Sequence, residues 1–263
     1  MKVGFLGWGK TGREAIVPFL QYPDVELEWV LRQSDQNAGE YASRLLFHEN
    51  DRGKIFGMSA WADGQFLDEH PVDVVVDFSN EGGVDRYSAF AQRGIRIVSA
   101  LSHRDEFAMQ QIHAAAEKVA VLSSPNITWG INFLIAVSGF LCAITDEPDI
   151  QIVEEHFAKK KGISGTALQI ARALDVDPDE NVYSIRAGGI LGRHEVIFGF
   201  PNQTVRLTHE TIHRAAFGRG ALTSARWLMK QPAGLYAMSD LIHEKLLAYL
   251  DKHLVPSTSP NET

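Results

Sequence analysis

The stretch that decides the fold is Met1–Leu20, MKVGFLGWGKTGREAIVPFL. An apolar strand over residues 1–6 leads into a glycine-rich turn, and a helical pattern follows over residues 13–20. The turn has the spacing Gly-x-Gly-x-x-Gly: the first glycine permits a tight bend, the second admits a pyrophosphate, and the third lets helix and strand pack closely. The sequence therefore predicts a dinucleotide site at the start of the chain. The residues expected to contact the cofactor there are Gly7, Trp8, Gly9, Lys10, Thr11 and Gly12.

The end of the second expected strand, residues 25–31, indicates which nicotinamide nucleotide is preferred. In NAD-binding folds a carboxylate near this position holds the ribose 2′-hydroxyl. Here the strand is followed by Arg32, Gln33 and Ser34, with no carboxylate among them. A guanidinium suits a 2′-phosphate instead, through charge-assisted hydrogen bonds. We therefore expect NADPH bound through Arg32, with NADH as the alternative.

Up to residue 126 the pattern alternates between strands and helices. Further strands are expected over residues 72–78, 96–99 and 119–123, and further helices over residues 39–47, 83–93 and 103–118. This alternation predicts an α/β fold with a Rossmann-type, doubly wound parallel sheet. Because ligands bind at the carboxyl ends of such strands, the loops after Phe78, Val98 and Ser123 should border the nicotinamide.

Beyond residue 149 the pattern changes to longer strands. They are expected over residues 150–153, 182–185, 195–200 and 203–208, after a long apolar helix over residues 133–144 and before helices over residues 220–229 and 239–253. The last two strands flank Pro201-Asn202 and predict a hairpin. We therefore expect a second, α+β domain with a mixed or antiparallel sheet. Residues 1–126 and 215–263 would form the dinucleotide-binding domain, residues 127–214 the substrate-binding and oligomerisation domain, and residues 255–263 a loose tail.

The segment Glu154–Ala167, EEHFAKKKGISGTA, gathers groups that suit an anionic ligand. It carries His156, whose side chain titrates near neutrality and can donate a proton, and then the lysines at 159–161. Ser164 or Thr166 can cap the helix that follows, and the free N–H groups of a helix start bind carboxylates. The segment predicts a carboxylate site beside a proton donor. The alternative is a solvated basic loop.

Composition excludes several classes of protein. The 263 residues, 45% hydrophobic and 22% charged, fit one large or two ordinary globular domains, and the net charge of −8 argues against a nucleic-acid partner. The single cysteine, Cys142, cannot form an internal disulfide, and neither a signal peptide nor an apolar membrane span is visible. We therefore expect a cytoplasmic protein. No metal site is expected, since His209 ends a strand and cannot pair with His213 on one helix face.

The order of these features resembles the dihydrodipicolinate reductase family, also called 4-hydroxy-tetrahydrodipicolinate reductase, of diaminopimelate and lysine biosynthesis. The resemblance covers residues 2–243 and rests on several segments. They are the glycine turn, VVVDFS at 74–79, NITWGIN at 126–132, Glu154-x-His156, SGTA at 164–167, Arg186-Ala187-Gly188 with Gly192 and His194, and matches at Arg214, Phe217, Gly220-Ala221 and Trp227-Leu228. Membership implies reduction of a cyclic imine dicarboxylate by NAD(P)H. It also implies a homotetramer formed by pairing of the second domain's sheets.

The resemblance assigns roles to particular residues. It implies that His156 is the proton donor and that Lys160 supplies positive charge where negative charge develops. The substrate contacts that it implies are Phe157, Lys159, Ser164, Gly165 and Thr166. The further cofactor contacts that it implies are Phe78, Ser99, Ser102, Pro125, Asn126, Arg214 and Phe217.

The chain departs from the family pattern near the expected substrate. Phe157 replaces a second histidine, the following loop is one residue shorter, and residues 99–102, SALS, replace Gly-Thr-Thr-Gly. If the loop is aligned from its far end, Glu155 instead of His156 takes the place of the first histidine; we prefer the register that keeps His156. Three functions stay open: the family's own reaction, a paralogous reductase of another cyclic imine or unsaturated amino acid, and a non-catalytic cofactor-binding protein.

Overall fold

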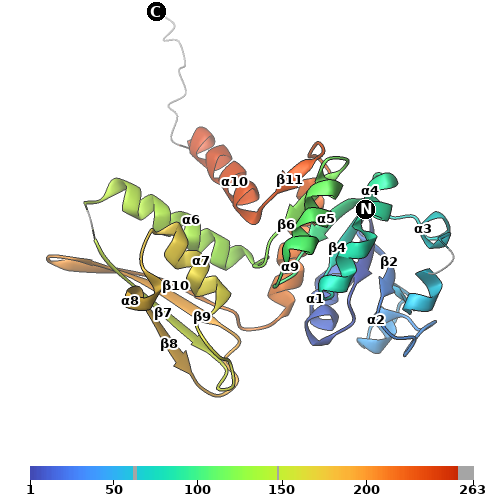
Figure 1. The fold of residues 1–263 in the computed structure, drawn as a ribbon, viewed down its shortest axis with the longest axis horizontal. Coiled ribbons are helices and arrows are strands. Elements are labelled where there is room, and N and C mark those ends of the chain that lie inside the picture. Colours follow the sequence, from blue (N-terminus) through green and yellow to red (C-terminus); the bar gives the residue numbers. More distant parts are fainter. Residues whose placement is uncertain (62–63, 147, 254–263) are drawn as a thin grey trace, which may run out of the picture.

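The amino-terminal half of the molecule is built on a parallel sheet. The computed structural model describes residues 1–61, 64–146 and 148–253, and within these ranges seven strands run in the order β11-β6-β5-β4-β1-β2-β3 (Figure 1). All neighbouring strands in this sheet are parallel. The strands are β1 Lys2–Leu6, β2 Glu26–Leu31, β3 Lys54–Phe56, β4 Val74–Asp77, β5 Arg96–Ser99, β6 Ala120–Ser123 and β11 Gly234–Tyr236.

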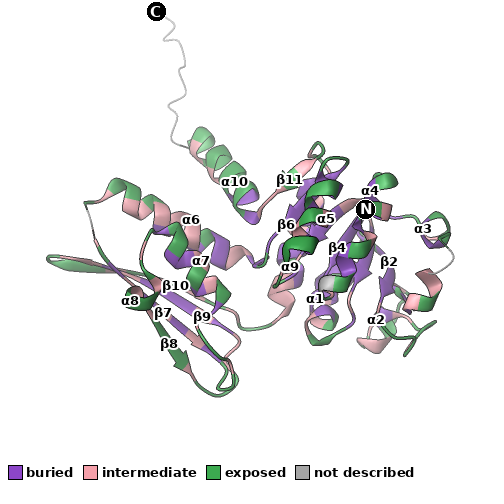
Figure 2. Ribbon diagram, viewed as in Figure 1, coloured by how far each residue is buried: buried purple, intermediate pink, exposed green. Residues whose placement is uncertain are grey.

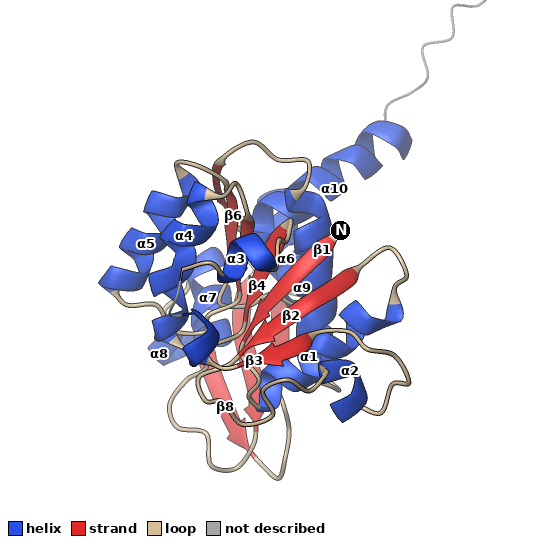
Figure 3. Cartoon of the chain, turned by 90° about the vertical axis from the view of Figure 1, so that its right-hand side faces the viewer, coloured by secondary structure: helices blue, strands red, loops and turns tan. Residues whose placement is uncertain are grey.

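Helices cover both faces of this sheet (Figure 3). They are α1 Lys10–Gln21, α2 Ala42–Leu45, α3 Phe66–Glu69, α4 Tyr87–Gln92, α5 Glu106–Ala116 and α9 Ala215–Leu228, with 3-10 turns η1 Met58–Trp61 and η2 Glu81–Arg86. Helices α1 and α9 pack together over one face, and α4 and α5 over the other. The continuous valines of β4 are fully buried because both faces are covered. The predicted doubly wound α/β architecture is confirmed.

The second sheet is smaller and mixed. It has the order β10-β9-β7-β8, in which β7 and β8 are parallel and the other two pairs are antiparallel. Its strands are β7 Asp149–His156, β8 Val182–Arg186, β9 Arg193–Phe200 and β10 Gln203–Glu210. Helices α6 Trp129–Ile144 and α7 Gly165–Ala173 pack against it, with the short α8 Pro178–Asn181 alongside (Figure 1). The predicted hairpin corresponds to β9 and β10.

Side chains on β7 alternate strictly between buried and less buried positions. Ile150, Ile152, Glu154 and His156 lie on the buried side, where the first two join the core beneath α6 and α7 (Figure 2). Because successive strand residues point to opposite faces, Glu154 and His156 must share a face. The other face of the sheet stays open. Tyr183 and Ile185 on this face are 57% and 46% exposed.

Several predicted elements differ in extent from the observed ones. The helix predicted over residues 39–47 shrinks to α2, because the backbone at Gly39 and Phe47 is left-handed, with φ of 87° and 64°. Strand β7 extends to His156 instead of ending at residue 153, since pairing with β8 continues that far. The edge strands β3 and β11 were missed because three residues are too few to show a periodic pattern.

Helix α10, Met238–His253, closes the described part of the chain and contacts both α6 and α9, so it packs against both halves. The predicted loose tail lies outside the described residues. None of the helices in the described ranges is long and apolar enough to cross a bilayer.

Candidate active site

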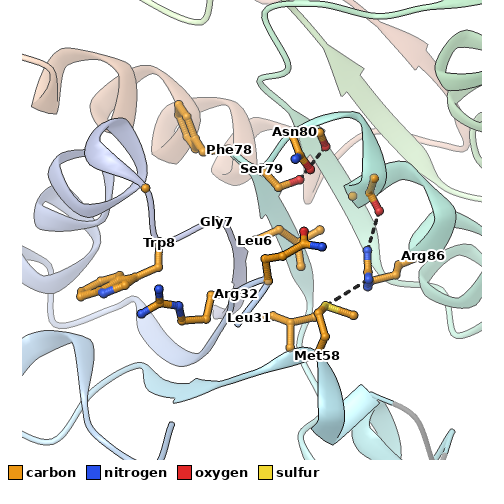
Figure 4. Close-up of a pocket in the computed structure, with 14 residues that line it drawn as sticks. Leu6, Gly7, Trp8, Leu31, Arg32, Met58, Phe78, Ser79, Asn80 and Arg86 are labelled. Atoms are coloured by element: carbon orange, nitrogen blue, oxygen red, sulfur yellow. Dashed lines mark hydrogen bonds between the residues drawn. The ribbon is translucent and has the colours of Figure 1, made fainter. Parts of the chain in front are cut away.

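The glycine turn opens onto a cavity of about 340 Å³ (Figure 4). Its walls include Gly7, Trp8, Gly9, Arg32, Phe78 and Arg86. Gly7 has a φ of 104°, and a Cβ there would lie 2.6 Å from the Phe78 carbonyl oxygen. A Cβ on Gly12 would lie 2.4 Å from the Gly7 oxygen, so helix and turn pack backbone to backbone. No atom lies within 4 Å of the Cβ direction of Gly9, which leaves that side open to the cavity. This turn fits a nucleotide pyrophosphate.

Arg32 stands at the wall of this cavity, held by the loop that follows it. Its guanidinium donates to the Gln36 carbonyl oxygen at 2.8 Å and to Asn37 Oδ1 at 3.1 Å. A second arginine, Arg86, lines the same cavity and donates to the Gly82 oxygen at 2.6 Å (Figure 4). Sequence reasoning missed Arg86, because nothing in a helical segment marks one arginine as facing a ligand. Burial lowers the pKa of the Arg86 guanidinium.

Asp77, fully buried at the end of β4, holds the loop that borders the cofactor cavity. Its carboxylate accepts the Tyr87 hydroxyl at 2.9 Å and the Ser79 backbone N–H at 2.7 Å. Burial raises the pKa of Asp77, partly offset by the hydrogen bonds from Ser79 and Tyr87. Burial likewise raises the pKa of the Tyr87 hydroxyl well above its ordinary value. The pair therefore fixes the backbone around Phe78 without facing solvent itself.

A second cavity, of about 330 Å³, lies where the two halves meet. It is lined by six of the predicted cofactor residues: Thr11, Phe78, Ser102, Pro125, Arg214 and Phe217. Leu191, from the loop between β8 and β9, also lines it, so both sheets contribute to its wall. Arg214, at the start of α9, lies 3.6 Å from Glu14 of α1. Lys10, the first residue of α1, is exposed.

Two predicted cofactor residues, Ser99 and Asn126, do not line the interdomain cavity, and Asn126 instead lines the smaller cavity described below. Ser99 is fully buried, and Ala100 rather than Ser99 lines the interdomain cavity, because strand alternation turns the serine inward. The geometry therefore gives the Ser99 side chain no path to a cofactor. Asn126 is also buried: its side chain donates to Thr166 Oγ1 at 3.1 Å and so ties the end of the first sheet to the start of α7.

A third, small cavity of about 60 Å³ adjoins the interdomain cavity. Residues Leu191 and Phe217 line both. Its polar lining includes three histidines from the second sheet, His156 on β7, His194 on β9 and His209 on β10. Thr166 on α7, Thr211, and Asn126 and Thr128 between β6 and α6 complete it. The register of the sheet places His194 opposite both Glu154 and His209.

The histidines on β9 and β10 were not predicted as site residues. His194 was quoted only as part of the family pattern, and His209 was considered only as a partner for His213. That partner is exposed and lies 3.5 Å from Glu14, whereas His209 faces the small cavity. A strand-alternation argument on the hairpin would have placed both histidines on the helix-facing side, but only pairing with β7 brings them beside His156.

Glu154 is the centre of the hydrogen bonding around this cavity. Its Oε1 atom accepts from Ser184 Oγ at 2.5 Å, from the Ser164 backbone N–H at 3.3 Å, and from Arg186. Its Oε2 atom lies 2.6 Å from His156 Nδ1. Burial opposes ionisation, but the hydrogen bonds from Ser184, Arg186 and Ser164 outweigh it and lower the pKa of Glu154 to about 2. The carboxylate is therefore charged at neutral pH.

The two neighbouring imidazoles are biased towards the neutral form. Burial, and then the positive charge of Lys160, lower the pKa of His156, while Glu154 acts in the opposite direction. Burial and the neighbouring His156 lower the pKa of His194 to about 3. The rings of His156 and His194 meet edge to face with centroids 5.2 Å apart, and His194 Nε2 lies 3.1 Å from Ser164 Oγ.

The start of α7 has the features of a carboxylate cradle. Ser164 caps the helix, accepting the Ala167 N–H on its hydroxyl at 3.0 Å. Gly165 is exposed, and Thr166 lines the small cavity. The first N–H groups of a helix have no partner within the helix, so those of Gly165 and Thr166 can receive an anion.

The basic loop lies at the edge of this arrangement. Phe157 and Lys159 are exposed, whereas Lys160 is half-buried; none of the three is among the residues lining the cavities described above. Arg186 holds the loop by donating to the Lys160 oxygen at 3.1 Å. Glu155, the alternative acid, points to the opposite face of the sheet and pairs there with Arg193.

One group of side chains in the described ranges could in principle hold a metal ion. Ligand atoms of Glu154, His156 and His194 lie within 4.8 Å of one another. The sequence did not predict this grouping, since it depends on the pairing of β7 with β9. Arg186 already occupies one carboxylate oxygen of Glu154, and a cation would have to bind beside that guanidinium. We therefore treat the group as a set of close polar contacts around the Glu154 carboxylate.

A dinucleotide-binding turn that lies beside a histidine-lined cavity is typical of nicotinamide-nucleotide-dependent reductases. Comparison with models of protein families shows to which family of reductases the chain belongs. The model described as "Dihydrodipicolinate reductase, N-terminus" matches residues 1–127, and that described as "Dihydrodipicolinate reductase, C-terminus" matches residues 130–242. The chain belongs to the dihydrodipicolinate reductase family and is an NAD(P)H-dependent oxidoreductase of that type.

Individual relatives agree with this assignment. The chain is 31% identical to the 4-hydroxy-tetrahydrodipicolinate reductase of Halorhodospira halophila, covering 91% of this chain and 98% of the relative. It is 34% identical to the enzyme of the same name from Caldanaerobacter subterraneus subsp. tengcongensis, over 65% of this chain and 76% of the relative. A solved structure of dipicolinate-bound dihydrodipicolinate reductase from Paenisporosarcina sp. TG-14 has the same fold, with a TM-score of 0.72 at 21% identity over 92% of this chain and 99% of that one.

Proposed function

We propose that the protein reduces 4-hydroxy-tetrahydrodipicolinate, a cyclic dicarboxylate, with NADPH in diaminopimelate and lysine biosynthesis. The observation that carries the proposal is the shared wall of two cavities: Leu191 and Phe217 line both the interdomain cavity and the cavity that contains His156. A planar ring placed across this wall would have its carboxylate at the start of α7 and its reacting carbons towards the cofactor side. The names of the relatives support the substrate.

The roles proposed for the start of α7 and for His156 follow from their positions, whereas that of Lys160, which lines none of these cavities, rests on the family resemblance. Reduced nicotinamide supplies the hydride when it is bound. The N–H groups of Gly165 and Thr166 hold one carboxylate of the substrate, helped by the helix dipole. His156 gives the proton to the carbon or nitrogen that becomes electron-rich, and Lys160 stabilises the negative charge that develops there. An anionic substrate beside His156 would raise the pKa of the imidazole and so favour the acid form that the step needs.

We propose NADPH as the preferred cofactor. Arg32 carries a half-buried, preorganised guanidinium at the wall of the turn cavity, held by Gln36 and Asn37. Its second terminal nitrogen also donates to Gln36 Oε1 at 3.3 Å, so this loop holds the positive charge at the cavity, where a phosphate would meet it. The second arginine of that cavity, Arg86, adds positive charge. Competition between NADPH and NADH at equal concentration would test this preference.

A paralogous reductase acting on another cyclic imine is the second candidate, and two observations favour it. The side chain of Ser99 is buried and Ala100 lines the cavity, so the hydroxyls that the family places there are missing. Phe157, 41% exposed, replaces a polar group near the basic loop and could stack on a bulkier ring.

An NADPH-oxidation assay separates these candidates. Enzymatically generated 4-hydroxy-tetrahydrodipicolinate should be turned over if the first candidate is right, whereas turnover of a different member of a cyclic-imine panel would establish the second. Binding of NADPH without turnover of any member would instead support a non-catalytic cofactor-binding protein.

We also propose a cytoplasmic homotetramer, with residues 1–126 and 215–263 as the cofactor domain and residues 127–214 as the substrate and assembly domain. The open face of the second sheet supports assembly, since it exposes Tyr183 and Ile185 beside the ion-paired Arg193. Light scattering should show tetramers for the native chain and smaller species for Ile185→Asp. Leu168→Asp, an exposed apolar position on α7, is the matched control and should stay tetrameric.

A further inference from the structure

We propose that Glu154 is a positioning residue that fixes the tautomer and orientation of His156 and couples the proton donor to the carboxylate cradle. The inference rests on the proposed reductase function and deepens it. Glu154 is fully buried and contacts both parts of the substrate site, His156 through Oε2 and the Ser164 N–H through Oε1. The sequence pattern had given it no role of its own.

The contact with His156 decides which ring nitrogen faces the substrate. With Glu154 Oε2 at 2.6 Å, Nδ1 is the nitrogen that carries a hydrogen in the neutral ring, because a buried carboxylate is an acceptor only. Nε2 then points away from Glu154, towards Gly192, where a Cβ would come within 3.0 Å of it. Nε2 is therefore the atom that delivers the proton, and a side chain at position 192 would obstruct it.

The contact with Ser164 joins the same carboxylate to the cradle. Ser164 donates its backbone N–H to Glu154, and its hydroxyl caps α7. The same hydroxyl is hydrogen-bonded to His194 Nε2. A substrate carboxylate bound at the first N–H groups of α7 would thus lie next to Ser164. The Ser164 backbone N–H in turn donates to Glu154, the residue that orients the proton donor. Arg186 and Ser184 keep the carboxylate charged and immobile.

Charges on every side of His156 enter the expected pH dependence. Glu154 on its own strand favours the imidazolium; Lys160 on the loop and Arg186 on β8 oppose it, and His194 on β9 is neutral. The remaining histidine that faces the small cavity, His209 on β10, has its pKa lowered by burial and is neutral as well. Replacing Glu154 by Gln removes the one negative charge among these groups, so the proton of His156 should be lost at lower pH.

The first test measures turnover against pH in the native enzyme, Glu154→Gln and the matched control Glu155→Gln, whose side chain lies on the opposite face of the sheet. Glu154→Gln should lower kcat roughly tenfold or more, move the midpoint of the alkaline loss of kcat/KM to lower pH, and leave the Kd for NADPH unchanged. Glu155→Gln should keep the native profile. An unchanged midpoint in Glu154→Gln, or equal effects in both variants, would overturn the proposal.

The second test does not depend on activity. Selective ¹⁵N-histidine NMR, with His156→Ala for assignment, reports the tautomer and pKa of the imidazole in the native chain and in Glu154→Gln. The native ring should be protonated on Nδ1, and Glu154→Gln should lose this preference and titrate at lower pH; identical spectra would refute the positioning role. If the native chain turns over no imine but the spectra differ as expected, the proposed function fails and the positioning role stands.

A third variant covers failure of Glu154→Gln to fold. Glu154→Asp keeps the charge for Arg186 but withdraws the carboxylate from His156 by one methylene. It should keep the native melting temperature and NADPH affinity while kcat falls several-fold. Native turnover with a native NMR tautomer in this variant would contradict the proposal.

Discussion

The cofactor half of this molecule and the half with the proposed acid-binding cavity are built by different means. The cofactor cavity depends on backbone: Gly7 and Gly12 are required because no Cβ fits beside Phe78 or beside the turn itself. The acid-binding cavity depends on side chains from three strands and a helix, centred on Glu154 and His156. A site built from backbone atoms tolerates substitutions at positions other than its glycines. A site built from a network of side chains is altered when any one of those side chains is replaced. The departures from the family pattern lie around both: Ala100 and Ser102 line the interdomain cavity, and Phe157 lies on the basic loop at the edge of the second site.

The largest effect expected from this comparison is that of His156→Ala. Removing the proposed proton donor should lower kcat about 10²-fold or more, the usual scale for a general acid, while NADPH binding stays native because the cofactor cavity is built elsewhere. Steady-state NADPH oxidation and fluorescence titration of NADPH measure the two quantities. Near-native turnover would reject the role of His156.

The next effect belongs to the cofactor half. Arg32→Ala should weaken NADPH binding about tenfold, or ~1.4 kcal/mol, through loss of charge-assisted hydrogen bonds to the 2′-phosphate. The affinity for NADH, which lacks that phosphate, should change little, and this provides the internal control. Equal losses for both nucleotides would show that Arg32 has only a structural role.

A smaller effect is expected on the pH dependence. A general acid works below its pKa, so kcat/KM should fall as pH rises through the pKa of His156 in the free enzyme. Because burial and Lys160 lower that pKa, the midpoint should lie below 6.5. Lys160→Met should move it upwards, since a neighbouring positive charge is removed. A midpoint above 6.5 in the native enzyme would contradict the structure.

The smallest effect should come from the helix cap. Ser164→Ala removes the hydroxyl that accepts the Ala167 N–H, and loss of such a cap lowers helix stability by about 1 kcal/mol. We expect binding of pyridine-2,6-dicarboxylate at this helix start to weaken about fivefold. Calorimetric titration measures this change, and NADPH affinity serves as the control. A loss of cofactor binding of the same size would mean that the substitution disturbs more than the cradle.

The sequence predicted the features that depend on local pattern. The glycine spacing, the valines of β4, the alternation of strands and helices, and the serine cap of α7 are all visible within a few consecutive residues, because bends, periods and caps are local properties of the chain. The rule that ligands bind at the carboxyl ends of parallel strands predicts the loops after Phe78, Val98 and Ser123, whereas Arg214 and Phe217 were implied by the family resemblance. The burial of Ser99 shows the limit of that rule, which identifies a loop but not the direction of each side chain.

The sequence by itself therefore determined the fold class, the dinucleotide turn and the helix start that can receive a carboxylate. Only the tertiary structure decided that Glu154 faces His156 while Glu155 faces Arg193, and that His194 and His209 join the same cavity. The reason is physical: the hairpin of β9 and β10 is local, but β7 pairs with β9 through partners far apart in the chain, from Glu155 with Arg193 to Asp149 with Gly199, and no local pattern encodes that register.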